Sequence, residues 1–147
     1  MRRALDLTVE GQRLFDGVQA TWNLLEPSAG PALALARQAG LGVVVKEALA
    51  NGRLTARNDD SAFVTKRRLL EEAASRLGTT LDALALAAVL AQPWADAVLS
   101  GATTREQLRS NLAALGVAWD EEAAEQLQAV AEDPQEYWAT RVRLPWN

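Results

Sequence analysis

Three short apolar runs divide the chain and predict three buried strands. They span residues 17–23, 42–46 and 96–100. Short continuous apolar runs bounded by Gly or Pro are typical of parallel strands that are buried on both faces. The stretch between the first two runs has helical spacing, begins near Pro31 and ends at Gly40. About a dozen residues is the length that a crossover between parallel strands requires, so this segment predicts a connecting helix.

The rest of the chain continues the alternation of strand and helix. Apolar periodicity predicts helices over residues 63–77, 81–91 and 103–115, and a last helix that begins at Asp120. Asp133-Pro134 is interpreted as the end of that helix, followed by a tail over residues 132–147, and residues 1–13 carry no clear pattern. Alternating elements of this kind predict an α/β fold with a parallel sheet. Three strands would leave unpaired edges, which indicates part of a larger sheet.

The stretch from Ser100 to Asn111 is the strongest candidate for a binding site. A glycine turn follows the third strand, and a helix then begins at Thr103 or Thr104. Both threonines have a Glu or Gln three residues later, which is the capping-box spacing. Free N–H groups and the positive end of a helix dipole make such a turn suitable for an anion such as a nucleotide phosphate. The same pattern also fits an ordinary strand-to-helix turn without a ligand.

Composition narrows the chemistry. The chain has 147 residues, enough for one domain, and a net charge of −4, which gives no basic surface for nucleic acid. It has no cysteine and no histidine, so disulfides, thiolate or imidazole metal sites and histidine acid–base catalysis are excluded. Acidic clusters such as Asp59-Asp60 and Glu71-Glu72 are interpreted as helix starts or solvated faces, and no metal site is expected.

The most apolar stretch, residues 81–99, is interrupted by Asp82, Gln92, Pro93 and Asp96. It is too interrupted for a membrane span, and residues 1–10 lack the apolar run of a signal peptide. We therefore expect a cytoplasmic protein with no membrane partner.

Three segments in register resemble one enzyme family. Residues 15–25 resemble the sixth strand of the aldo-keto reductases, residues 42–45 with 49–54 their seventh strand and its loop, and residues 100–111 their eighth strand and phosphate loop. Residues 136–147 are also similar to the ends of some members. The family is an eight-stranded (β/α) barrel that binds NADPH without a Rossmann fold. The resemblance implies a partial TIM barrel, with residues 1–147 as a single C-terminal half-barrel that contains about three parallel strands, barrel strands 6–8.

The resemblance also implies roles for individual residues. Gln19 would bind the nicotinamide carboxamide, and Gln107 with Asn111 would face the adenosine end from one helix face. The phosphates would contact the turn before the helix, and a loop over residues 47–60 would close over them. These two groups are Gly101, Ala102, Thr103 and Thr104 in the turn and Leu49, Asn51, Gly52 and Leu54 in the loop. Considered alone, Gln19 and Asn111 also fit exposed polar positions, and Asn51-Gly52 fits a plain turn.

The chain departs from the family at the nicotinamide. Lys46 stands where members usually have an aromatic residue that stacks on the ring. Gly101 and Gln107 stand where members that favour NADPH often have basic residues, although Arg105 or Arg109 could reach a 2′-phosphate. The expected cofactor is NADP (NADPH), with NAD as the alternative.

The catalytic groups of the family are missing. They are an Asp, a Tyr, a Lys and a His from the first half of the barrel, whereas this chain has no histidine and its single tyrosine, Tyr137, lies in the predicted tail. No residue is therefore assigned a catalytic role. We expect the cofactor-binding portion of an NAD(P)H-dependent oxidoreductase that is inactive alone and pairs with an N-terminal half-barrel chain or with itself through its sheet edges. The alternative is a non-catalytic nucleotide-binding or protein-interaction module.

Overall fold

A parallel sheet forms the centre of the molecule. The computed structural model describes residues 7–144. Its sheet has the order β3 (Gly17–Thr21), β4 (Gly42–Lys46) and β5 (Ala97–Val98), and both pairings are parallel. The predicted α/β fold with three neighbouring parallel strands is confirmed. The first and third strands are shorter than predicted, because pairing stops where the chain turns away after Thr21 and Val98.

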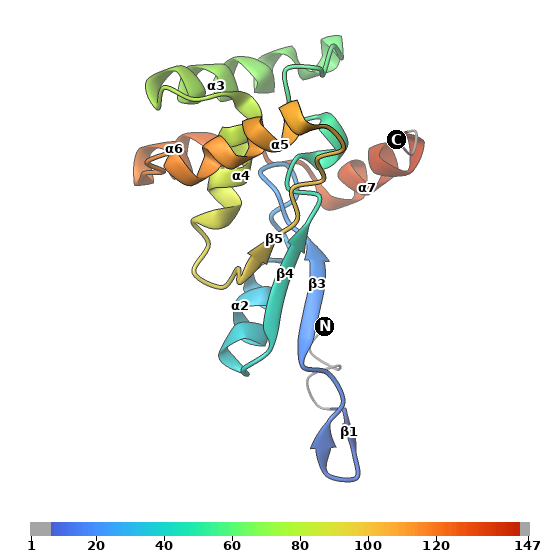
Figure 1. Cartoon of the computed structure of the whole chain (residues 1–147). Coiled ribbons are helices and arrows are strands. Elements are labelled where there is room, and N and C mark those ends of the chain that lie inside the picture. Colours follow the sequence, from blue (N-terminus) through green and yellow to red (C-terminus); the bar gives the residue numbers. More distant parts are fainter. Residues whose placement is uncertain (1–6, 145–147) are drawn as a thin grey trace.

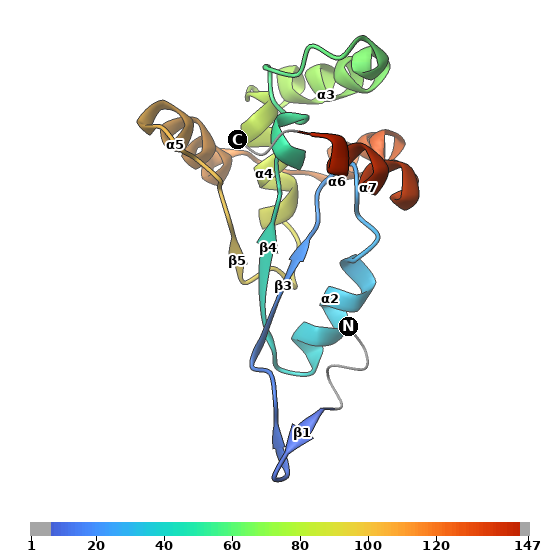
Figure 2. The same ribbon diagram turned by 90° about the vertical axis from the view of Figure 1, so that its right-hand side faces the viewer.

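Six helices accompany the sheet within the described residues. They are α2 (Gly30–Gln38), α3 (Val64–Arg76), α4 (Leu81–Leu90), α5 (Arg105–Leu112), α6 (Glu121–Gln126) and α7 (Pro134–Arg143). Four 3-10 turns join them: η1 (Ala50–Gly52), η2 (Ser61–Phe63), η3 (Ala113–Gly116) and η4 (Leu127–Val130). Helix α2 lies alongside the strands, whereas α3 and α7 lie beyond their carboxyl ends (Figures 1 and 2).

One hydrophobic cluster attaches the helices to the sheet. Val43 and Val45 of β4 are fully buried and belong to one cluster with Leu33 of α2 and Leu86 of α4. Trp22 and Trp94 close this cluster with ring centroids 5.6 Å apart in an edge-on arrangement. Burial of each valine contributes roughly 1.5–3 kcal/mol, so this cluster holds the helical layer on the sheet.

A second cluster lies among the helices. Leu70 of α3, Leu84 of α4, Leu127 of η4 and Tyr137 of α7 pack together beyond the ends of the strands. Helix α4 contributes to both clusters, and its residues from Ala83 to Val89 are all buried. A helix that is apolar on all sides is stable only when other elements surround it, which explains its composition.

Membrane-spanning segments require long, strongly apolar helices. In the described part of the chain, no single helix is long and apolar enough to span a membrane. The two helical segments Ser61–Arg76 and Leu81–Leu90, which are bent by 80° relative to each other, reach the required length and composition only when they are taken together.

Both ends of the described chain differ from the expectation. Thr8–Val9 (β1) and Gln12–Arg13 (β2) form a small antiparallel hairpin that projects beyond the sheet, where no element was predicted (Figure 1). Much of the predicted tail is helix α7, because Asp133 caps its first turn and Pro134 occupies the first helical position. Proline is favoured there, since its missing N–H has no partner at a helix start. Residues 1–6 and 145–147, which these expectations also covered, lie outside the described residues.

Candidate nucleotide-binding site

Two loops meet at the carboxyl ends of the strands. One follows β4 and contains η1, and the other joins β5 to α5. The first loop has an unusual backbone, since Glu47, Ala50 and Asn51 have positive φ angles of 57°, 47° and 55°. Residues other than glycine adopt this conformation at a cost of about 1–3 kcal/mol, and such strain is concentrated at functional sites. The strained backbone of this loop therefore indicates a functional site at this end of the sheet.

Helix α7 holds the strained loop in place. Arg141 donates two hydrogen bonds to the Glu47 carboxylate, both of 3.1 Å, and both side chains are largely buried. Asn23 donates from Nδ2 to the Glu47 carbonyl oxygen at 2.9 Å and to the Tyr137 hydroxyl at 3.0 Å. Burial raises the pKa of Tyr137, although Asn23 opposes the shift. The phenol thus has a structural role as a neutral group that links α7 to the end of β3.

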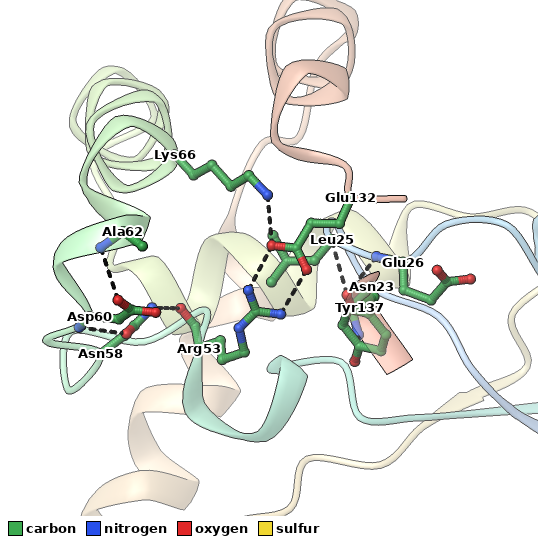
Figure 3. A network of polar contacts seen from close by, with 10 residues as sticks. All are labelled: Asn23, Leu25, Glu26, Arg53, Asn58, Asp60, Ala62, Lys66, Glu132 and Tyr137. Atoms are coloured by element: carbon green, nitrogen blue, oxygen red, sulfur yellow. Dashed lines mark hydrogen bonds and ion pairs between the residues drawn. The ribbon is translucent and has the colours of Figure 1, made fainter. Parts of the chain in front are cut away.

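A partly buried ion cluster fixes the far part of the same loop. Arg53 makes two hydrogen bonds to Glu132, of 2.6 and 2.8 Å, and Lys66 of α3 contacts the same carboxylate at 2.6 Å (Figure 3). Burial raises the pKa of Glu132, but Arg53 and Lys66 outweigh burial and hold the pKa below its ordinary value. Glu132 is therefore a carboxylate at neutral pH, and it joins three segments that are distant in sequence.

The second loop ends in the predicted capping box. The Thr104 hydroxyl accepts from the Gln107 N–H at 3.2 Å, and Gln107 Oε1 accepts from the Thr104 N–H at 3.3 Å. Gln107 Oε1 also accepts from the N–H and the hydroxyl of Thr103, at 2.8 and 3.0 Å. This differs from the predicted anion site. Three donors assigned to phosphates, the Thr103 N–H and hydroxyl and the Thr104 N–H, are therefore engaged by Gln107 within the helix cap.

The first of two clefts lies between the N-terminal ends of α4 and α5, and we call it the α4–α5 cleft. It has a volume of about 400 Å³. Ligand sites in proteins have volumes of about 300–1,000 Å³. Its walls are loop residues, the start of α4 and one face of α5: Leu49, Thr55, Ala56, Arg57, Thr80, Leu81, Asp82, Gly101, Ala102, Glu106, Gln107, Ser110 and Asn111.

The second cleft opens at the ends of β4 and β5, and we call it the strand-end cleft. Its volume is also about 400 Å³. It is lined by both loops and by α7: Lys46, Glu47, Ala48, Leu49, Asn51, Gly52, Arg57, Leu99, Ser100, Gly101, Thr103 and Arg141. Leu49, Arg57 and Gly101 line both clefts, so the two adjoin.

Eight of the eleven predicted site residues line these clefts. They are Leu49, Asn51, Gly52, Gly101, Ala102, Thr103, Gln107 and Asn111. Gln107 and Asn111 share a wall of the α4–α5 cleft, as their spacing on one helix face predicts. Asn111 is only 6% exposed, and its Nδ2 donates to the Ser100 carbonyl at 2.9 Å, which ties α5 to the strand-end turn.

Three predicted residues line neither cleft. Gln19 is the third of five residues in β3 and not at its end, and it lies exposed on the sheet. Leu54 is 1% exposed and packs in the cluster among the helices, because the turn after η1 directs it inward. Thr104 is occupied as the helix cap.

Several lining residues had no assigned role. The charged ones are Lys46, Glu47, Arg57, Asp82, Glu106 and Arg141. Arg57 lies in the predicted loop, but Arg53 lies there too, and no local signal distinguishes the two arginines. Asp82 and Glu106 look like ordinary first-turn acids in sequence, and Arg141 lies in the segment taken as a tail. No group of three or more potential metal ligands occurs among residues 7–144.

Comparison with known proteins identifies the family. A model described as the aldo/keto reductase family matches residues 9–132. The match covers most of the chain, so this protein belongs to the aldo/keto reductase family. A search of curated proteins found no match.

Solved structures agree with this assignment at the level of the fold. The apo form of aldo-keto reductase AKR11C1 from Bacillus halodurans matches with a TM-score of 0.70 and 21% identity, over 89% of this chain and 47% of that one. Its holo form matches with a TM-score of 0.69 and 21% identity, over 89% and 46%. The thermostable aldo-keto reductase Tm1743, in complex with the inhibitor epalrestat, matches with a TM-score of 0.62 and 26% identity, over 76% and 38%. The chain thus spans 38–47% of the length of these structures, and its fold corresponds to part of their barrel.

Proposed function

We propose that this chain is the cofactor-binding, C-terminal portion of an NAD(P)H-dependent aldo-keto reductase and reduces no carbonyl by itself. The observation that carries the proposal is the pair of adjoining clefts at the carboxyl ends of three parallel strands. In (β/α) barrels, active sites lie at this end of the strands. An elongated ligand with two polar ends, such as a dinucleotide, matches two clefts that share a wall.

The charges support a phosphate position where the clefts meet. Arg57 lines both clefts and Lys46 lines the strand-end cleft, and neither side chain has an ion-pair partner within residues 7–144. Unpaired cations favour an anion, and Arg can bind a phosphate through two parallel hydrogen bonds. We assign the pyrophosphate to Arg57, the adenosine end to the α4–α5 cleft and the nicotinamide end to the strand-end cleft.

The reducing step requires more than these residues supply. When bound, the reduced nicotinamide delivers hydride to a carbonyl carbon. The carbonyl oxygen then needs a proton donor placed where negative charge develops. The only tyrosine, Tyr137, is 1% exposed and engaged by Asn23, and the sequence has no histidine. We propose that the donor comes from an N-terminal half-barrel. A second copy is the weaker candidate, since two sets of three strands make six and the family barrel has eight.

A titration of the purified chain with NADH and NADPH tests the binding part. Energy transfer from the five tryptophans to the dihydronicotinamide reports binding. Arg57→Gln should weaken the binding of both nucleotides by about tenfold, because both contain the pyrophosphate. The control is Arg105→Gln on α5, whose side chain lines neither cleft. Absence of saturable binding by the unaltered chain would refute the proposal.

Activity tests the remaining part. The chain alone should show no carbonyl-dependent oxidation of NADH or NADPH, and co-expression with an N-terminal half-barrel should restore it. Turnover by the chain alone would contradict the proposal. Binding without activity in any such combination would favour the non-catalytic nucleotide-binding module.

A further inference from the structure

The walls of the α4–α5 cleft carry an unequal distribution of charge. Two carboxylates, Asp82 at the start of α4 and Glu106 at the start of α5, line it together with one cation, Arg57. Arg57 also lines the neighbouring cleft, where the proposed function assigns it to the pyrophosphate. The part of the α4–α5 cleft that remains for the adenosine is therefore acidic.

Helix geometry explains why the basic residues of α5 do not change this balance. Residues that lie four apart share a helix face. The face that lines the cleft contains Glu106, Gln107, Ser110 and Asn111. Arg105 and Arg109 lie four apart on another face and do not line the cleft. They are exposed, so neither arginine supplies the positive charge that a phosphate in the cleft would need.

The two acidic side chains differ in their hydrogen-bond partners. Burial raises the pKa of Asp82, but hydrogen bonds from Ser110 and Thr80 outweigh it and hold the pKa below its ordinary value. Glu106 is exposed at the mouth of the cleft, and no hydrogen bond to its side chain is made within the described residues. Its two oxygens are available to accept hydrogen bonds from a ligand.

The cleft wall also contains a buried polar group with spare capacity. Asn111 is largely buried and uses its Nδ2 on the Ser100 carbonyl, while its Oδ1 accepts no hydrogen bond from any described residue. The cleft thus presents hydrogen-bond acceptors from Asn111 and Glu106. Ribose hydroxyls and an exocyclic amine are donors, whereas a phosphate dianion is only an acceptor.

We infer that the α4–α5 cleft selects a dinucleotide whose adenosine ribose has free 2′- and 3′-hydroxyls, which is NAD, over one with a 2′-phosphate, which is NADP. The inference rests on the proposed function, because it takes the adenosine to lie in this cleft. Glu106 accepts from the ribose hydroxyls, and its charge repels a 2′-phosphate. This reverses the order of cofactors that the family resemblance favoured.

Affinities for NADH and NADPH, measured on the full chain at low ionic strength, test the inference. NADH should bind about tenfold more tightly, because juxtaposed like charges penalise the 2′-phosphate. Glu106→Gln should reduce the ratio of NADH affinity to NADPH affinity, mainly because NADPH binds more tightly. Glu106→Lys should reduce this ratio further. The control is Glu125→Gln on α6, an exposed glutamate that lines neither cleft and should leave the ratio unchanged.

The outcomes separate this inference from the proposed function. Equal binding of the two nucleotides, or tighter binding of NADPH, would overturn the inference and leave the proposed function intact. Failure of both to bind would overturn both. A second measurement needs no variant: added salt should shrink the NADH preference, because screening weakens the repulsion. A ratio that is independent of salt and of residue 106 would also overturn the inference.

Discussion

The two faces of the parallel sheet differ in what covers them. On one face, Val43 and Val45 are fully buried beneath α2 and α4. On the other, Gln19 and Ala97 are exposed, and Leu99, just beyond β5, is 46% exposed. Figure 2 shows α2, α6 and α7 on one side of β3 and β4. The described chain therefore completes only one side of its sheet.

The difference indicates where stability comes from and where function requires more. The inner face of a (β/α) barrel is a packed core filled by side chains from all its strands. Three strands supply only part of that filling, and the edges of β3 and β5 are not paired within residues 7–144. Packing against the helices stabilises the chain, whereas the open face and edges are where the proposed function would place the rest of a barrel.

A charge introduced on each face of the sheet provides the strongest test. Val45→Asp should lower the free energy of unfolding by more than about 4 kcal/mol, because an unpaired charge would enter the core under the helices. Val44→Asp, one residue away on the open face, should change it by less than about 1 kcal/mol. Chemical denaturation followed by circular dichroism measures both. Equal destabilisation would show that the two faces are equally buried.

The ion cluster around Glu132 gives the next largest effect. Glu132→Gln leaves Arg53 and Lys66 without their carboxylate and should destabilise the chain by about 3 kcal/mol near neutral pH. The native pKa is depressed, so the stabilisation is fully present above the unfolded value of 4.5 and is lost as the pH falls through the native pKa. The difference between the two proteins should shrink over that range.

Denaturation curves at several pH values check this expectation. Glu72→Gln is a suitable control, since Glu72 forms only an exposed pair with Arg68 at 3.6 Å. Exposed pairs contribute little to stability, so the control should stay close to the unaltered chain. A Glu132 effect that did not change with pH would contradict the role assigned to its charge.

The tyrosine that links α7 to β3 gives a smaller effect. Tyr137→Phe removes one hydrogen bond, but Asn23 Nδ2 keeps its bond to the Glu47 carbonyl. We expect a loss of about 1 kcal/mol in unfolding free energy. Absorbance titration of the unaltered chain should show the phenol ionising above its ordinary pKa, because burial disfavours the charged form. Ionisation at the ordinary value would mean that the phenol is exposed.

The elements of the fold could be predicted because their signals are local. The glycine and proline boundaries located the strands, and the Thr104 and Gln107 spacing located the start of α5. Helix α7 was missed because Asp133-Pro134 ends one helix and also begins the next. A proline after a capping residue is compatible with an irregular tail and with a new helix. The packing of Tyr137 in the core favours the helix.

The charges of the site could not be predicted, because they come from separate segments. Arg57, Asp82 and Glu106 meet in one cleft although no local pattern connects them. Likewise, Glu47 and Arg141 are 94 residues apart in sequence, and their pairing depends on how α7 packs. The resemblance placed a residue in the clefts correctly where the backbone alone determines its position, as at Gly101. It failed at Leu54, whose side chain turns into the core.

Substitution of Gln19 should have the smallest effect on the stability of the chain alone, so it separates stability from cofactor binding most clearly. Its side chain is exposed on the open face of β3, so Gln19→Ala should change the unfolding free energy by less than about 0.5 kcal/mol. In a barrel completed by an N-terminal half, the same change should weaken binding of the dihydronicotinamide by about tenfold, since a carboxamide can both donate to and accept from the ring amide. Denaturation of the chain and nucleotide titration of the completed barrel measure the two quantities. Loss of stability in the chain alone would mean that Gln19 is part of its core, and unchanged affinity in the completed barrel would remove it from the site.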